Sequence, residues 1–106
     1  MTPSELTTLR EEVTAIGRDL AALEQRATMA TAADAWELLR DVLPIFGRTS
    51  AVQNPYIDLR PLRPGEEPRL MPAGFEDVYV PSHAFHARAS VVVARCHQAL
   101  GWPTRP

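Results

Sequence analysis

Apolar residues recur at alternating spacings of three and four over the first thirty residues of the chain. This spacing places them on one side of a helix, at the core positions of successive heptads. It predicts a long helix over about residues 3–29. Because a stripe of two positions in seven is narrow, the helix needs a partner, either another helix of the same chain or a second copy. The expected interface residues are Leu6, Leu9, Val13, Ile16, Leu20 and Leu23, and the stripe continues at Ala27 and Ala30.

Local signals predict where the first two helices begin and end. Thr2 and Glu5 form a capping box, and Pro3 occupies the first helical position, where its missing N–H costs nothing. A second capping box at residues 31–34 predicts a second, shorter helix over about 32–46, which Pro44 distorts and Gly47 ends. Its expected apolar positions are Ala35, Trp36, Leu39, Val42, Leu43 and Phe46. Within the first helix, Gly17 allows a neighbour to approach closely.

A proline-rich connection over residues 47–81 follows the second helix. Its six prolines predict an extended arm that covers the helices or reaches a partner, with one helical turn at 50–53. Residues 56–59 and 77–80 alternate like short strands and are expected to pair as a minimal β-ribbon. Residues 61–64 match the PxxP pattern, which is typical of an extended connector and also of ligands for proline-binding domains.

The last third of the chain predicts an amphipathic helix over about residues 82–100 that stops at Gly101. Its apolar arc consists of Phe85, Ala89, Val92, Val93, Cys96, Ala99 and Leu100. Cys96 lies within this arc, so we interpret it as a small hydrophobic core residue. The expected fold is all-α, a small helical bundle that forms a single domain over residues 1–106.

Three histidines and Ser90 lie along one flank of the third apolar arc, while Arg88 and Arg95 lie on the other. His83 and His86 are three residues apart and are weak candidates for metal ligands, with a carboxylate at 76 or 77 beside them. The pair lacks a zinc-type spacing. We therefore assign no metal and no cofactor, and interpret the histidines as boundary residues of a helix interface.

The composition is that of one ordinary globular domain. The chain has 106 residues, is 45% hydrophobic and carries a net charge of −2. It has no apolar run of the roughly 18 residues that a membrane span needs, and no secretory pattern at its N-terminus. The single cysteine fits a reducing compartment. These features predict a cytoplasmic protein without a membrane partner.

Charge is distributed unevenly along the chain. Residues 1–46 hold four arginines and eight acidic residues, whereas residues 82–106 hold three arginines and no acid. The main interpretation is that a basic C-terminal helix packs beside an acidic N-terminal pair, within or between chains. A second interpretation is a nucleic-acid surface on that helix, for which three arginines give little positive charge.

The first helix also resembles a known enzyme family. Leu6, Leu9, Arg10, Val13, Ile16, Leu20, Leu23 and Arg26 together look like the first helix of the all-helical chorismate mutases. The resemblance implies a small helical dimer whose first helix supplies active-site arginines, with Arg10 as the matching residue. Arg26 is one residue away from the family's second arginine position, which Ala27 occupies.

These observations lead to one main functional hypothesis and two alternatives. We expect a non-enzymatic accessory or regulatory protein that self-associates and binds another protein, because the sequence carries a partner-seeking stripe and no common catalytic motif. The first alternative is a small helical enzyme or carboxylate binder that uses Arg10, Arg26, Arg88 and Arg95. The second alternative is nucleic-acid binding through the C-terminal helix.

Overall fold

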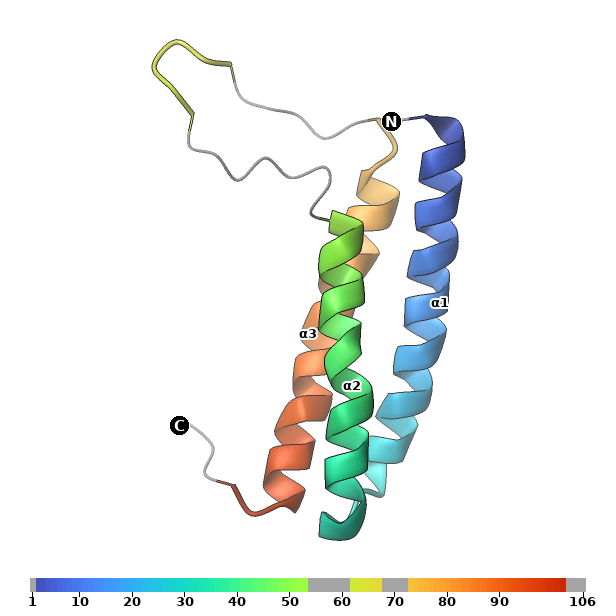
Figure 1. Cartoon of the computed structure of the whole chain (residues 1–106), viewed down its shortest axis with the longest axis vertical. Helices are drawn as coiled ribbons and strands as arrows, with labels where there is room; N and C mark the ends of the chain where they lie inside the picture. Colours follow the sequence, from blue (N-terminus) through green and yellow to red (C-terminus); the bar gives the residue numbers. More distant parts are fainter. Residues whose placement is uncertain (1, 54–61, 68–72, 103–106) are drawn as a thin grey trace.

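The described part of the protein consists of three helices. The structure, a computed structural model, describes residues 2–53, 62–67 and 73–102. Helix α1 spans Pro3–Thr28, α2 spans Ala32–Gln53 and α3 spans Glu76–Ala99. Helices α1 and α3 run in the same direction, and α2 runs antiparallel to both (Figure 1). The predicted all-α class is confirmed for these residues, and none of their helices combines the length and apolarity needed to cross a membrane.

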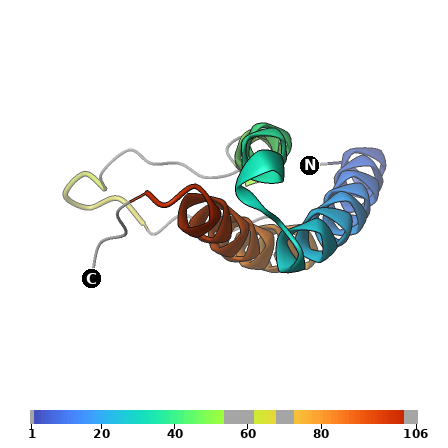
Figure 2. The ribbon, with the colours of Figure 1, turned by 90° about the horizontal axis from the view of Figure 1, so that it is seen from below.

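All three helices contact one another around a common core. Seen along the bundle, α2 lies on one side of the pair formed by α1 and α3 (Figure 2). The stripe of α1 provides part of this core, because Val13, Ile16, Leu20 and Leu23 are buried while Leu6 and Leu9 pack against its edge. In the structure, α2 and α3 of the same chain therefore cover this stripe.

The first helix begins with the capping arrangement that the sequence indicates. The hydroxyl of Thr2 accepts a hydrogen bond from the Glu5 backbone N–H at 3.1 Å, and the Glu5 carboxylate accepts one from the Thr2 backbone N–H at 3.4 Å. At the start of α2, the Thr31 hydroxyl donates to the carboxylate of Asp34 at 3.0 Å. The bonds at Thr2 satisfy backbone N–H groups at the start of α1. The bond at Thr31 joins two side chains and differs from the predicted reciprocal capping box, in which the hydroxyl accepts from a backbone N–H.

The second helix is longer than predicted. It continues through Pro44 and Gly47 to Gln53, so the expected end near residue 46 is wrong. Pro44 is exposed, which lets water satisfy the carbonyl that lacks its helical N–H donor. Burial favours continuation, because the core positions repeat past both residues. They are Ala35, Leu38, Leu39, Val42, Ile45, Thr49 and Val52.

This longer helix presents a different face to the core than the sequence predicted. Leu38 and Ile45 are buried, whereas Trp36 is 59% exposed and Leu43 is 52% exposed. The expected apolar set mixed residues from the core face with residues from an outer face, because both faces carry large apolar side chains.

The third helix begins earlier than predicted. It starts at Glu76 rather than near residue 82, so residues 77–80 are helical and the predicted strand there is wrong. Pro81 lies inside the helix. The adjacent Ser82 is fully buried, where its hydroxyl donates to the Tyr79 carbonyl at 2.9 Å and accepts from the Gln53 amide at 2.8 Å. This buried pair joins α2 to the first turns of α3.

The ends of α3 are set by backbone geometry. Gly74 has a φ of +84°, and Phe75 beside it is completely buried. Gly101 has a φ of +72° and follows the last turn, where the Trp102 N–H donates to the His97 carbonyl at 2.9 Å. This is the closure expected of a glycine-terminated helix.

The predicted connection over residues 47–81 is too long, because residues 47–53 belong to α2 and residues 76–81 belong to α3. Residues 62–67 form an exposed turn in which the Glu66 N–H donates to the Arg63 carbonyl at 3.0 Å. The predicted strand at 56–59 and the first proline of the PxxP match lie outside the described residues.

Candidate interaction surfaces

Two of the four candidate arginines form ion pairs at opposite ends of α1. The Arg10 guanidinium lies 3.0 Å from the carboxylate of Asp77 on α3, and that of Arg26 lies 2.9 Å from the carboxylate of Asp41 on α2. Sixteen residues along a helix correspond to about 24 Å. Arg10 and Arg26 therefore cannot act together on one small substrate within the same chain.

Arg88 is the third candidate, and it joins α3 to α1. Its guanidinium donates two hydrogen bonds to the carboxylate of Glu24, one of them from Nε at 3.1 Å, and lies 5.3 Å from the centroid of the Phe85 ring. The Arg88 hydrogen bonds lower the pKa of Glu24, while the same bonds raise the pKa of Arg88. The charge of Arg88 is therefore neutralised by Glu24, and its guanidinium is not free to bind a carboxylate ligand.

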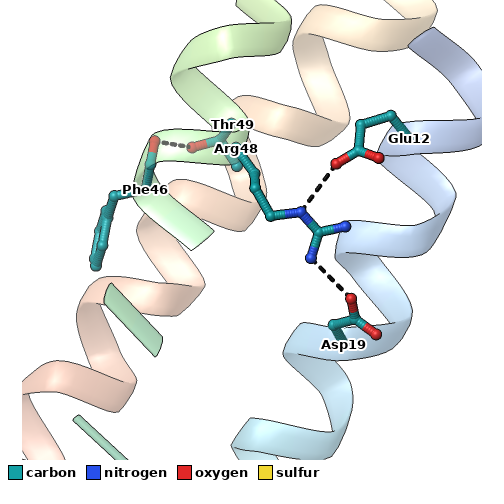
Figure 3. A network of polar contacts seen from close by, with 5 residues as sticks. All are labelled: Glu12, Asp19, Phe46, Arg48 and Thr49. Carbon is teal, nitrogen blue, oxygen red and sulfur yellow. Dashed lines mark hydrogen bonds and ion pairs between the residues drawn. The ribbon is translucent and has the colours of Figure 1, made fainter. Parts of the chain in front are cut away.

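Arg48 is a further interhelical arginine that the sequence analysis did not single out. It reaches from α2 between two carboxylates of α1, with Nε 2.9 Å from Glu12 and an Nη atom 2.8 Å from Asp19 (Figure 3). Hydrogen bonds to Asp19 and Glu12 raise the pKa of Arg48. The available signal was the seven-residue spacing of the two acids, which places them on one face of α1.

Arg95 differs from the other three candidates. It is exposed, and no carboxylate among the described residues lies within ion-pair distance of it. It borders a hollow of about 130 Å³ between α1 and α3, together with Glu24, Ala27, Thr28, Val91 and Val92. Ligand pockets generally enclose about 300–1,000 Å³, so this hollow is too small to enclose a metabolite of ordinary size.

The histidines of α3 contact aromatic rings. His86 meets Phe46 of α2 edge to face with centroids 4.9 Å apart, and His83 stacks on Tyr79 at 6.0 Å. Asp77, one of the expected carboxylate partners, is paired with Arg10. Within the described ranges, no three His, Cys, Asp or Glu residues are grouped so that they could hold a metal ion.

Large apolar side chains gather at the end of the bundle where α1 turns into α2 and α3 ends. Trp36 and Trp102 pack edge to face with centroids 5.0 Å apart, and His97 lies 5.0 Å from Trp102. Met29, in the turn, is 83% exposed. We call Met29, Trp36 and Trp102 the aromatic end. Open depressions of about 610 and 420 Å³ flank it on either side of Glu37.

A second apolar surface runs along α3. Val80 and Val91 are 62% and 55% exposed, and the alanines between and beyond them are exposed as well. We call this set the α3 stripe; it consists of Val80, Ala84, Ala87, Val91 and Ala94. The spacings of four and three are present in the sequence, but the core arc of the same helix has similar spacings and larger apolar side chains.

Cys96 is completely buried in the core, and burial raises the pKa of its thiol. A nucleophilic cysteine needs an accessible and electropositive setting, so this thiol is placed as a packing residue.

No protein-family model, curated protein or solved structure matches the chain. Arg10, Arg26 and Arg88 form separate ion pairs rather than gathering around one cavity, and exposed apolar groups make up the aromatic end and the α3 stripe.

Proposed function

We propose that the protein is a small non-enzymatic accessory or regulatory protein of the cytoplasm that acts through self-association and through binding another protein. The observation that carries this proposal is the aromatic end, where Trp36 and Trp102 pack on each other and still expose 59% and 38% of their surface. Tryptophan and methionine are enriched at protein interfaces, because each buries a large apolar area when a partner covers it.

The shape of the aromatic end also suits a protein partner. Ala33, Trp36, Glu37 and Arg40, which line the larger depression, are all exposed, so it is an open surface rather than an enclosed pocket. Glu37 and Arg40 supply the polar rim that commonly surrounds an apolar interface centre.

Affinity capture with matched variants tests the proposed partner site. The tagged protein would be cross-linked in an extract of its source cells, and captured proteins would be quantified by mass spectrometry. We expect at least one protein to be captured by the wild type and by Leu43→Ser, but to be lost with Trp36→Ser combined with Trp102→Ser. Leu43 is a suitable control because it is an exposed apolar residue of the same helix. Equal capture by all variants, or no specific capture, would contradict the proposal.

The enzyme alternative predicts chorismate turnover. We expect no loss of chorismate above background, because the carboxylates of Asp77 and Asp41 already neutralise Arg10 and Arg26. Incubating purified protein with chorismate and following its absorbance tests this expectation. Turnover that disappears with Arg10→Gln would establish the alternative instead.

The nucleic-acid alternative predicts binding that weakens steeply with salt. Glu24 compensates Arg88, which leaves Arg95 as the exposed, uncompensated arginine among the described residues of α3. We therefore expect no measurable shift of labelled duplex DNA or RNA at 150 mM salt. A salt-sensitive complex that Arg95→Gln abolishes would contradict this expectation.

A further inference from the structure

The α3 stripe has the spacing of a helix–helix interface, but neither of the other two described helices, α1 and α2, covers it. Its five residues follow spacings of four, three, four and three, the core pattern of a heptad. On one flank of the stripe, Arg88 bonds to Glu24 of α1. On the other flank, His86 contacts Phe46 of α2. The stripe therefore lies on the outward side of α3, and Val91 at its α1 edge also borders the hollow between α1 and α3.

We propose that a second copy of this chain covers the α3 stripe, with the two α3 helices antiparallel and Ala87 on the two-fold axis. The order of large and small side chains supports this arrangement. With Ala87 facing the partner's Ala87, each valine packs beside an alanine: Val80 lies level with the partner's Ala94, and Val91 lies beside the partner's Ala84, offset by one residue. A two-fold interface has to be self-complementary. This stripe meets that condition because its large side chains lie beside small side chains of the other copy.

Charge complementarity also favours the antiparallel arrangement. The acidic residues of α3, Glu76 and Asp77, are both in its first turn, where Asp77 also pairs with Arg10 of its own chain, whereas Arg95 and His97 are near its end. Antiparallel pairing brings each acidic end beside the basic end of the other copy and aligns the two helix dipoles favourably. Parallel pairing would instead place like charges together at both ends.

The centre of the interface is compatible with close approach. Ala84, Ala87 and Ala94 have small side chains that let two helix backbones come near each other, and Arg88 beside them is neutralised by Glu24 of its own chain. A strip of alanine and valine buries less area than the roughly 800 Å² per partner of a standard interface, so we expect a concentration-dependent dimer.

This inference rests on the self-association part of the proposed function, and sedimentation equilibrium separates the two. We expect the wild type to dimerise and Ala87→Arg to raise the dimer dissociation constant at least about 100-fold, because two like charges then meet on the axis. The matched control is Ala22→Arg, which places the same residue at an exposed alanine of α1 and should leave the constant within about twofold. Circular dichroism verifies that both variants fold.

The outcomes are distinct. A wild type that remains monomeric at several hundred micromolar overturns both the α3 interface and self-association, and leaves partner binding at the aromatic end unaffected. A wild-type dimer that Ala87→Arg does not weaken overturns the α3 interface alone.

Cysteine cross-linking tests the orientation. Under mild oxidation, Ala87→Cys should link to itself, and a mixture of Val80→Cys with Ala94→Cys should link as a heterodimer, since a disulfide needs Cα atoms within about 7 Å. Val80→Cys alone should not link, because antiparallel pairing separates the two copies of that position. Efficient linking of Val80→Cys alone would show a parallel pair and overturn the proposal. The native thiol of Cys96 is buried, so the wild type provides the background.

Discussion

The Phe85 ring packs directly on Gly17, where an added Cβ would lie 2.8 Å from the ring atom Cζ. This contact brings α1 and α3 close together in the middle of both helices. The guanidinium of Arg88 lies near the same ring. It is bonded to Glu24, which is seven residues after Gly17 on α1. The glycine, the ring and the ion pair together fix how the two parallel helices sit against each other.

Substituting Gly17 by alanine should destabilise the protein in spite of the better helix propensity of alanine. Propensity contributes about 1 kcal/mol in favour of alanine, whereas overpacking against a ring typically costs about 1–3 kcal/mol. We expect a net loss of about 1 kcal/mol in the free energy of unfolding, measured by urea denaturation. In a Phe85→Leu background the same substitution should be neutral or stabilising, because the ring atom that it meets is gone.

The control for this substitution is Gly47→Ala on α2. Gly47 also lies inside a helix, but no atom outside its own surroundings would come within 4 Å of an added Cβ. We expect a gain of about 0.5–1 kcal/mol from helix propensity alone. A loss of stability at Gly47 as large as that at Gly17 would show that packing against Phe85 is not the cause.

Replacing Arg48 by glutamine should cost about 1 kcal/mol, because Glu12 and Asp19 lose the cation that both of them bind. The control is Arg40→Gln, since Arg40 is 76% exposed and its nearest carboxylates are 4.0 Å away on the same helix. That change should stay within about 0.3 kcal/mol. Urea denaturation at low and at high salt provides the measurement, and equal effects of the two substitutions would contradict a special role for Arg48.

Stability should decrease in acid partly because of Glu24. The hydrogen bonds from Arg88 hold the pKa of this carboxyl below its ordinary value near 4.5, which means that the folded state binds its proton less readily than the unfolded state. The contribution is complete above the ordinary pKa and disappears as the pH falls through the lowered one. Because the pair is partly exposed, we expect no more than about 1 kcal/mol.

Glu24→Gln should remove this part of the pH dependence, as measured by thermal unfolding between pH 7 and 3. Glu37→Gln is the matched control, because Glu37 is 66% exposed and lies 4.0 Å from Arg40. An unchanged acid slope in Glu24→Gln would show that the ion pair contributes nothing to it.

The Cys96 thiol should react slowly in the native protein. It is completely buried, and burial raises its pKa, so both access and the thiolate fraction are low. We expect the reaction with a thiol-specific disulfide reagent at pH 8 to be at least about 100-fold slower in the folded protein than in concentrated urea. Comparable rates in both conditions would contradict the buried placement.

Local signals in the sequence predicted the all-α class, the start of α1 and the end of α3. Thr2, Pro3 and Glu5 form the cap of α1, because these bonds depend on residues only three apart. Gly101 follows the end of α3 for a similarly local reason, its positive φ. In contrast, the sequence predicted a helix end at Gly47 and a helix start near residue 82, whereas Gly47 and Pro81, like Pro44, lie inside helices.

The candidate surfaces were harder to predict than the helices. Sequence periodicity placed Arg88 and the histidines on opposite flanks of α3, yet it contained no information that Glu24 would neutralise Arg88 or that Phe46 would meet His86. It also predicted one apolar face for α2 and one for α3, whereas the structure shows that Trp36 and Leu43 of α2 and the α3 stripe are exposed. Only the positions of the neighbouring helices show which face is buried.

By itself, the sequence determined the all-α class, the start of the first helix and the existence of a stripe on α1 that has to be covered, because these follow from spacing and hydrogen bonds within a few residues. The tertiary structure decided that α2 and α3 cover that stripe, that helices continue through proline and glycine, and that four arginines bind carboxylates on other helices, namely Arg10, Arg26, Arg48 and Arg88. These outcomes depend on contacts between residues far apart in the chain, where the free energy of burial outweighs local preference.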